Sequence, residues 1–323
     1  MRSIQFETVS VIVPTYNDTD DLAGCLEALD RQTVRDKLEI VVSIDGHEHI
    51  PEYVADRADI IVEGSHCGPA AARNRGWKAS SGDPVLFTDS DCIPDTEWAE
   101  KMMGILQQRA DAVKGVYTEG GNRVIQRLAQ IEFNERYKLL SSHETIDMID
   151  TYSAGYRRDV LEETGGFDES FPFPNHEDVD LSYKIVAKGY RLLFEPAAKV
   201  SHRHRDTWRA YFRMKFSRGR WRMNILRRYP GKAGSDTYTP KCLKIQIILC
   251  PFLLPAAALI ALTGLPLAIW GGIFLISTIP LAIVALADDK SLVPVVPFFI
   301  FWRACALFSG MCRGIFASRE VNE

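Results

Sequence analysis

One short run decides the fold, and it reads Pro84-Val85-Leu86-Phe87-Thr88-Asp89-Ser90-Asp91. Its first half is apolar and opens with proline, which is typical of a short buried strand. Two carboxylates separated by a single residue follow at once. Since ligands in open α/β sheets bind beyond the carboxyl ends of the strands, this pattern predicts a ligand site directly after the strand.

The same arrangement occurs twice earlier in the chain. Residues 8–14 and 38–44 are β-branched runs that we predict to be strands, and they lead into Thr15-Tyr16-Asn17 and Asp45-Gly46. The carboxyl ends of neighbouring parallel strands meet at one edge of a sheet. We therefore expect these polar residues and the acidic pair to face one crevice.

Strand and helix patterns alternate along this part of the sequence. Further strands are predicted over 59–62 and 112–117, and helices over 20–31, 69–80 and 95–109. This alternation predicts an α/β fold with a mostly parallel, Rossmann-like sheet covered by helices.

The acidic pair Asp89 and Asp91 indicates a metal site. If the strand continued through both residues, their side chains would point to the same side. Two carboxylates so close repel each other unless a cation lies between them. Oxygen ligands suit Mg²⁺ or Mn²⁺, and such an ion can neutralise a leaving diphosphate.

The composition changes after residue 244. The overall hydrophobic fraction of 46% is ordinary, yet Ile245–Ala287 contains no charged residue. That length allows two spans of about 20 residues each, with a turn at Thr263–Pro266. A third apolar stretch, 292–316, contains two arginines and is either a third span or an interfacial helix. A pair of soluble core helices is the alternative for the first two.

A basic segment precedes these apolar stretches. Eleven Lys and Arg lie between Arg203 and Lys232, against one acidic residue, Asp206. Such a cluster favours the cytoplasmic side and attracts anionic lipid, so we expect no nucleic acid partner. Apolar residues near helical spacing predict an amphipathic helix on the membrane, or alternatively a basic helix packed on the catalytic domain: Trp208, Phe212, Phe216, Met223 and Leu226.

The cysteines and the N-terminal residues indicate the compartment. Seven cysteines without a CxxC pair predict reduced thiols, and Met1–Ser10 lacks the apolar core of a signal peptide. We expect a multi-pass membrane protein with a cytoplasmic catalytic domain. The predicted parts are a catalytic domain over 1–205, a juxtamembrane segment over 206–243 and a transmembrane region over 244–323.

Six strings, taken in order, resemble the family 2 glycosyltransferases of the GT-A fold. The resemblance covers roughly residues 8–205, and the order of the strings makes it far more specific than any one of them. The strings are Val9-Ser10-Val11-Ile12-Val13-Pro14-Thr15-Tyr16-Asn17, Ile40-Val41-Val42-Ser43-Ile44-Asp45-Gly46, Gly68-Pro69-Ala70-Ala71-Ala72-Arg73-Asn74-Arg75-Gly76, Leu86-Phe87-Thr88-Asp89-Ser90-Asp91, Gly165-Gly166-Phe167-Asp168-Glu169 and Glu177-Asp178-Val179-Asp180-Leu181.

The resemblance implies a pocket for the nucleotide base. It is lined by Pro14, Thr15, Tyr16 and Asp45, with the Tyr16 ring stacking on the base and Asp45 accepting a hydrogen bond from a uracil N–H. The family often has two adjacent acids before the glycine, whereas this chain has Ile44 in the first position. A core-edge aromatic is the alternative role for Tyr16.

The resemblance also implies contacts to the rest of the donor. Arg73 would lie near the diphosphate or hold the base-side loop, with an internal salt bridge as the alternative. Asp89 would face the ribose or the sugar, and Asp91 would bind Mg²⁺ or Mn²⁺. His202 is either a further metal ligand or a structural residue.

By the same resemblance, Asp178 is the catalytic base that takes a proton from the acceptor hydroxyl. Glu177 would orient Asp178 or touch the acceptor. This implies a single displacement with inversion at the anomeric carbon. The alternative is that both are acids stabilised by the dipole at a helix N-terminus.

These features predict transfer of a sugar from a nucleotide-sugar donor, with UDP-sugars favoured, to a lipid-linked or glycan acceptor of the cell envelope. A nucleotidyltransferase is an alternative, but it usually has a glycine-rich basic loop where this chain has Thr15-Tyr16-Asn17. A non-catalytic membrane scaffold with the same fold is the other alternative. Arg220-Trp221 match the end of a processive-synthase signature, but Ser217 replaces its glutamine, so processivity is not predicted.

Overall fold

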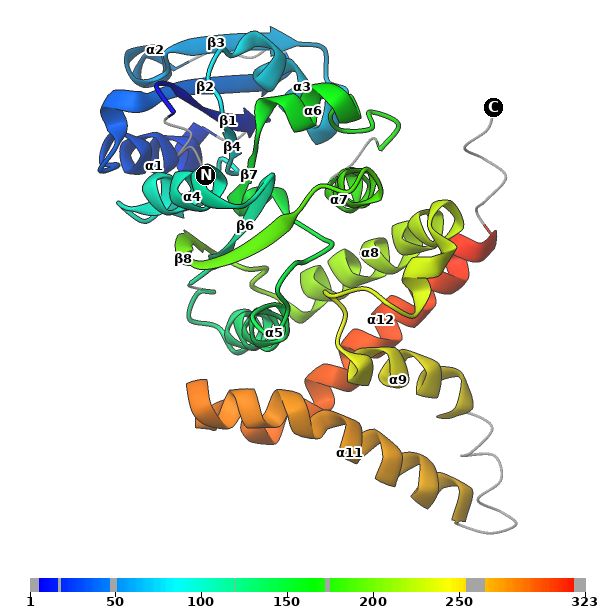
Figure 1. The fold of residues 1–323 in the computed structure, drawn as a ribbon. Coiled ribbons are helices and arrows are strands. Elements are labelled where there is room, and N and C mark those ends of the chain that lie inside the picture. The colour runs from blue at the N-terminus through cyan, green and yellow to red at the C-terminus, as the bar shows by residue number, and fades with distance from the viewer. Residues whose placement is uncertain are drawn as a thin grey trace. The chain divides into compact units, whose positions relative to one another are not determined.

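The computed structural model describes residues 6–16, 19–46, 51–118, 120–171, 175–253 and 265–316 (Figure 1). The chain divides into two compact units. The first comprises residues 1–120 and 140–203, and the second comprises residues 121–139 and 204–323. The sequence analysis placed 121–139 inside the catalytic domain, whereas the structure groups this segment with the C-terminal helices.

An eight-stranded sheet forms the centre of the first unit, in the order β3-β2-β1-β4-β7-β6-β8-β5. The strands are β1 Val9–Thr15, β2 Leu38–Asp45, β3 Ile60–Gly64, β4 Val85–Phe87, β5 Cys92–Pro94, β6 Ala112–Tyr117, β7 Ala154–Tyr156 and β8 Leu192–His202. The neighbours β3, β2, β1 and β4 are parallel, as predicted.

The sheet as a whole is mixed: four of its seven strand pairings are parallel, in agreement with the predicted mostly parallel sheet, and three are antiparallel. Strand β7 enters between β4 and β6 and is antiparallel to both, and β5 is antiparallel to β8. Both β5 and β7 have only three residues, too few to show a period in the sequence.

Helices cover the sheet, and α3 positions the polar rim (Figure 1). Helix α3, Pro69–Ala79, starts with proline in its first turn and buries three consecutive alanines. Gly76 lets it approach the sheet closely, because a Cβ there would lie 2.5 Å from the Ile12 side chain. The other helices of this unit are α1 Thr19–Asp30, α2 Glu52–Arg57, α4 Trp98–Gln108, α6 Arg158–Thr164 and α7 Glu177–Ala187.

The second unit is helical. Its helices are α5 Val124–Leu140, α8 Trp208–Arg228, α9 Lys241–Leu249, α11 Leu265–Asp288 and α12 Val296–Phe316. One hydrophobic core joins apolar side chains of α5, α8, α11 and α12. The predicted amphipathic helix is confirmed as α8, but its fully buried face consists of Tyr211, Lys215, Gly219 and Ile225 rather than the predicted apolar stripe.

Two segments, Pro266–Asp288 and Lys290–Phe316, are long and apolar enough to cross a bilayer. Only 28% of the first and 39% of the second is buried inside the protein. Residues 254–264 of the span predicted to begin at Ile245 lie outside the described residues, including Thr263 and Gly264 of the predicted turn. The other two residues of that turn, Leu265 and Pro266, begin α11.

Candidate active site

The carboxylates predicted to act together come from three elements of the first unit. Asp45 ends β2, Asp89 and Asp91 lie in the turn after β4, and Asp178 lies in the first turn of α7. Strands β2, β1 and β4 are parallel neighbours, so Asp45 and the acidic pair stand at the same end of the sheet.

Helix α3 ties these elements together through two arginines. Arg73 donates from Nη1 to Glu177 Oε1 at 2.7 Å and from Nη2 to Asp89 Oδ1 at 3.0 Å. Arg75 donates to Asp45 Oδ1 at 3.4 Å. The Arg73 and Glu177 side chains are only 5% and 3% exposed. Arg73 therefore makes the internal salt bridge that was the alternative in the sequence analysis, and its contact with a diphosphate stays a prediction.

The predicted base pocket has an exposed aromatic face. The Tyr16 ring is 49% exposed and stacks on His66, with centroids 4.1 Å apart. His66 Nδ1 lies 3.0 Å from Asp45 Oδ2. Thr15 and Pro14 precede this stack at the end of β1. Sequence reasoning missed His66, because a histidine in a loop 21 residues after Asp45 gives no signal of contact with it.

Asp45 itself is buried and already holds a loop. Its carboxylate accepts the backbone N–H groups of Cys67 at 3.0 Å and Gly68 at 2.8 Å. Gly68 precedes α3 with a φ of 93°, which favours glycine. Asp45 thus shapes the start of α3, while its predicted bond to a base stays a prediction.

Asp91 and His202 are adjacent, as a shared metal site requires. The pairing of β5 with β8 sets Cys92 opposite His202, and His202 Nδ1 lies 3.4 Å from Asp91 Oδ1. Burial opposes protonation of His202, but the hydrogen bond and charge of Asp91 outweigh it and raise the pKa of the imidazole. One ligand atom from each of Asp91, Cys92 and His202 lies within 4.8 Å of the others.

The two carboxylates of the acidic pair have different partners. Asp89 binds Arg73 of α3, whereas Asp91 lies beside His202 of β8. The expectation from strand alternation does not apply, because the strand ends at Phe87 and a turn closed by Cys92 N–H to Asp89 O follows. The 43% exposed side chain of Asp91 remains open to a ligand.

Asp178 lies at the start of α7, where the backbone turns sharply. His176 precedes it with a φ of 68°, and Val179 N–H donates to Asp178 Oδ1 at 2.8 Å. Burial, followed by the charges of Glu177 and Asp150, raises the pKa of Asp178 well above its ordinary value. A carboxyl with a raised pKa holds a proton more strongly, which suits a general base. Glu177 faces Arg73.

Sequence reasoning also missed a buried polar group beside these acids. Lys114 donates to Asp150 at 2.5 Å and to the Tyr152 hydroxyl at 3.0 Å. The Tyr117 ring stacks on Tyr152 at 3.5 Å and on His202 at 4.9 Å between centroids. These contacts form a continuous chain of side chains from Asp150 to the Asp91–His202 pair. The residues lie too far apart in the sequence for a local pattern to indicate that they meet.

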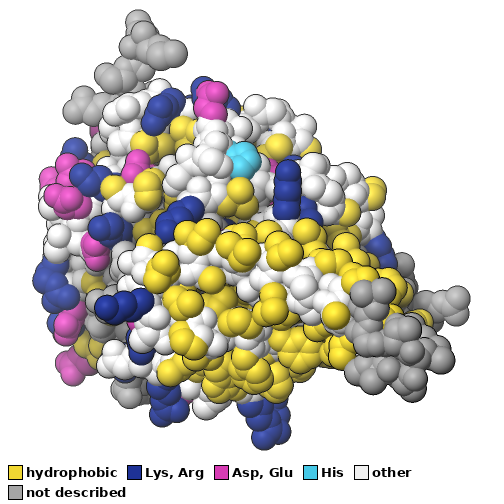
Figure 2. Space-filling view, turned by 90° about the horizontal axis from the view of Figure 1, so that it is seen from below, with side chains coloured by type: hydrophobic (Ala, Val, Ile, Leu, Met, Phe, Trp, Pro, Cys, Tyr) yellow, Lys and Arg dark blue, Asp and Glu magenta, His cyan; other side chains and the backbone are white. Residues whose placement is uncertain are grey.

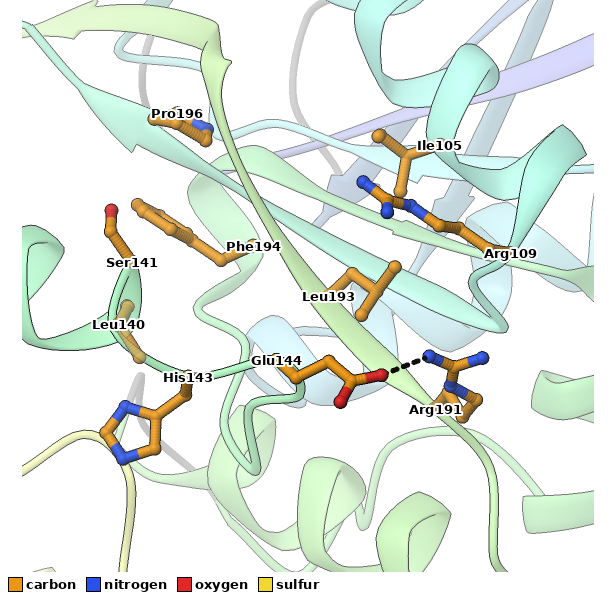
Figure 3. Close-up of a pocket in the computed structure, with 10 residues that line it drawn as sticks. All are labelled: Ile105, Arg109, Leu140, Ser141, His143, Glu144, Arg191, Leu193, Phe194 and Pro196. Carbon is orange, nitrogen blue, oxygen red and sulfur yellow. Dashed lines mark hydrogen bonds and ion pairs between the residues drawn. The ribbon is translucent and has the colours of Figure 1, made fainter.

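A cavity of about 320 Å³ lies elsewhere in the first unit (Figure 3). Apolar side chains and two arginines line it, and Arg191 pairs with Glu144 at 3.2 Å. None of the predicted site residues is among its lining residues, which are Ile105, Arg109, Leu140, Ser141, His143, Glu144, Arg191, Leu193, Phe194 and Pro196. The acidic residues at the ends of β2 and β4 and at the start of α7 remain the candidate site.

Comparisons with known proteins find glycosyltransferases similar to this chain. The pre-mycofactocin glycosyltransferase of Mycobacterium tuberculosis is 29% identical over 236 residues, which are 69% of this chain and 48% of that protein. Glycosyltransferase AglE of Haloferax volcanii is 31% identical over 205 residues, 58% of this chain and 64% of that protein. The chain thus spans about half to two thirds of these relatives.

Among solved structures, the mannosyltransferase PcManGT of Pyrobaculum calidifontis, in complex with GDP-Man and Mn²⁺, has the same fold. Its TM-score is 0.63 at 21% identity, over 98% of this chain and 89% of that one. The family model described as glycosyl transferase family 2 matches residues 10–165, the part that contributes Asp45, Arg73 and the acidic pair. Residues 10–165 therefore match the family 2 glycosyltransferases, and the sheet that they help to form has the GT-A fold.

Proposed function

We propose that the chain is a glycosyltransferase that moves a sugar from a nucleotide-sugar donor, UDP-sugars being favoured, to a lipid-linked or glycan acceptor. The observation that carries the proposal is the cross-link made by Arg73, which joins the acidic turn after β4 to the Glu177-Asp178 pair of α7. The turn that contains Asp91, the proposed metal ligand, is thereby fixed relative to the start of α7, which contains Asp178, the proposed general base.

The base would lie against Tyr16. The ring is exposed and already stacked on His66, so it presents an aromatic face to a planar ligand. Asp45 would receive a base N–H in place of Arg75 or His66, which share its two oxygens with the backbone N–H groups of Cys67 and Gly68. Both Nη atoms of Arg73 already donate to carboxylates, so Arg73 would affect the donor indirectly, by holding Asp89 in position.

Asp91 and His202 fit a divalent cation. The open carboxylate of Asp91 offers a hard oxygen ligand, and the imidazole adjoins it. The third nearby group, the Cys92 thiol, is fully buried, and burial raises its pKa well above the ordinary value, so it fits a hard ion poorly. Mn²⁺ suits this oxygen and nitrogen pair, and the fold of PcManGT holds Mn²⁺ with GDP-Man. The cation would supply positive charge to the departing diphosphate.

Asp178 would take the proton of the acceptor hydroxyl. As that proton leaves, the hydroxyl oxygen forms a bond to the anomeric carbon. The bond from this carbon to the diphosphate oxygen breaks, and the nucleoside diphosphate departs with the electron pair. One displacement inverts the configuration. Arg73 holds the neighbouring Glu177 in place, and the start of α7 orients Asp178.

The second unit would attach the enzyme to a membrane. Two segments have the length and apolarity for it, and their exposed side chains are largely apolar. The basic residues of α8 would favour the cytoplasmic face, where nucleotide sugars are available. A membrane-linked acceptor follows from this attachment.

The test is a screen of UDP-, GDP- and dTDP-sugars for release of nucleoside diphosphate, with and without Mn²⁺. One donor is expected to be turned over only with the metal. Asp178→Asn should lower kcat on the order of 100-fold or more. The matched control is Asp159→Asn, since Asp159 is a 56% exposed carboxylate that pairs with Arg157 and, like Asp178, accepts a hydrogen bond from the next backbone N–H.

Three results would contradict the proposal. Donor hydrolysis that is unchanged in Asp178→Asn would remove this residue as the base. Absence of both turnover and donor binding across the whole screen would favour the non-catalytic scaffold. An anomeric configuration retained in the product would exclude the single displacement.

A further inference from the structure

Helices α8 and α12 of the second unit pack backbone to backbone. A Cβ built on Gly310 would lie 2.0 Å from the Phe216 carbonyl oxygen, and one on Gly314 would lie 2.4 Å from that of Arg220. Gly219 of α8 makes the reciprocal approach to Leu307. Such small residues allow two helices to approach closely over several turns.

This contact extends over almost the whole of both helices. At one end, Trp302 Nε1 donates to Trp208 O at 3.1 Å, and at the other, Arg227 Nη2 donates to Gly314 O at 2.9 Å. Rising numbers in one helix meet rising numbers in the other, since Trp208 meets Trp302 and Arg220 meets Gly314, so the helices are parallel. Wherever α12 lies in a membrane, α8 lies beside it at the same depth.

Helix α8 is too charged to share the hydrocarbon interior. Its 21 residues include no acidic residue and eight basic ones. The basic residues are Arg209, Arg213, Lys215, Arg218, Arg220, Arg222, Arg227 and Arg228. The Lys215 ammonium is buried against Glu132, but Arg209, Arg213, Arg227 and Arg228 are exposed. Charged side chains at the centre of a bilayer are strongly disfavoured unless they are paired inside the protein.

We propose that α12, in spite of its length and apolarity, does not cross the membrane but lies with α8 along an anionic bilayer surface. The inference rests on the proposed membrane attachment and specifies how it is made. The arginines of α8 would meet lipid phosphates, while apolar side chains such as Phe298 and Phe316, which are 54% and 82% exposed, would enter the acyl region.

The part that dips into the bilayer would be formed by α9 and α11, which contribute most of their length to the uncharged run Ile245–Ala287. The two helices are antiparallel, since Gln246 donates to Ser277 O and Trp270 donates to Leu249 O, both at 2.9 Å. Exposed apolar side chains cover α11, and Figure 2 shows a broad hydrophobic surface with Lys and Arg at its margins. The exposed apolar side chains of α11 are those of Ile269, Ile273, Leu275, Ile276, Ile279, Ile283 and Leu286.

Both ends of this part of the chain are polar and lie on the same side. Lys244 pairs with Asp236 at 3.2 Å before the uncharged run. After it, Asp288 accepts from Asn134 of α5 at 2.8 Å, and Asp289 pairs with Arg127 of the same helix. The chain therefore returns to the polar side before α12 begins.

Arg303, midway along α12, fits this arrangement. Its guanidinium is buried, donates to Gln246 at 2.9 Å and lies 3.6 Å from Glu132 Oε1 of α5. Glu132 also pairs with Arg136 and Lys215. The middle of α12 is thus fastened to α5 and α8, the two helices of this unit that are rich in polar residues.

The test is the sidedness of three single cysteine variants of the full chain in membrane vesicles of one orientation. Gly231→Cys follows α8 and has open space for a side chain. Lys290→Cys lies between α11 and α12, and Arg313→Cys near the end of α12, both at exposed positions. A membrane-impermeant maleimide is applied before and after detergent, and peptide mass spectrometry separates these sites from the native cysteines.

All three positions are expected to react from the same side without detergent. If Arg313→Cys reacts at least about tenfold less than Lys290→Cys before detergent, α12 crosses and the inference is overturned. If Lys290→Cys alone is protected, α11 and α12 both cross and it is overturned as well. Release of the unmodified chain by an alkaline carbonate wash is a separate result, which would overturn the membrane attachment itself.

Discussion

The Arg73→Met substitution tests the frame of the candidate site. The change keeps much of the side-chain length but removes both hydrogen bonds to Glu177 and Asp89. Glu177 is 3% exposed, and its Oε2 atom has no hydrogen-bond partner among the described residues, so its charge would be left buried and uncompensated. Breaking a buried ion pair in this way costs about 3–5 kcal/mol. Half-exposed Asp89 should suffer less, since water can solvate it.

The assay is native-state hydrogen exchange of the first unit, followed at the amides of β4 and α7. Since 1.4 kcal/mol corresponds to a factor of ten, a cost of about 3 kcal/mol accelerates exchange there by more than about 100-fold. Arg31→Met is the control, because Arg31 is 60% exposed and its pair with Glu27 should be worth less than about 1 kcal/mol.

A double variant separates charge burial from lost packing. Adding Glu177→Gln to Arg73→Met removes the uncompensated charge, so the pair of changes should be less destabilising than Arg73→Met alone. If Arg73→Met costs less than about 1 kcal/mol, the cross-link is not what holds α7 to the acidic turn. If the two costs simply add, Glu177 and Arg73 are not energetically coupled.

Three further outcomes are expected. Burial and the charges of Glu177 and Asp150 raise the pKa of Asp178, so activity should fall as pH falls through that raised value. Asp150→Asn removes one of these charges and should move the acid limb of the kcat/KM profile to lower pH. An acid limb that does not move would contradict the assignment of Asp178 as the base. Asp91→Asn should weaken Mn²⁺ affinity, measured by calorimetry, on the order of 10-fold or more, and an unchanged affinity would exclude Asp91 as a ligand. Burial lowers the pKa of Lys215 from 10.5 to about 7, although the charge of Glu132 acts in the opposite direction. Between pH 7 and 10.5, Lys215 therefore binds a proton more strongly in the unfolded chain than in the folded one. Stability of the second unit should therefore rise from about pH 7 toward 10.5 and be lost as pH falls through 7, and Lys215→Met should flatten this dependence in thermal unfolding scans.

The parallel half of the sheet could be predicted because its signals are local. The predicted strand over 38–44 is β2, Leu38–Asp45, and the helix over 69–80 is α3, Pro69–Ala79. Both have a clear apolar pattern and a proline or charged residue at their limits. The three-residue strands β5 and β7 have no such pattern, and only pairing with distant strands stabilises them.

The candidate site was predictable by residue type and position but not by partner. The structure brings Asp91 next to His202, the last residue of β8, while their shared role as metal ligands stays a prediction. That Arg73 would bind Asp89 and Glu177 at once was left open, because these residues are up to 104 positions apart. His66, Lys114 and the Tyr117–Tyr152 stack gave no signal, because nothing in their own neighbourhoods distinguishes them from surface or core residues.

Local chemistry along the chain was enough to determine the strand–loop–helix units, the acids that follow the strands and the uncharged run Ile245–Ala287, because each depends on residues close together in the sequence. Only the tertiary structure decided which charges pair and which face of α8 is buried. Lys215 and Arg303 can be buried only because Glu132 of α5 meets them, and no local pattern records such a meeting. The free energy of a buried charge depends on the groups that surround it in space, and folding alone assembles those groups.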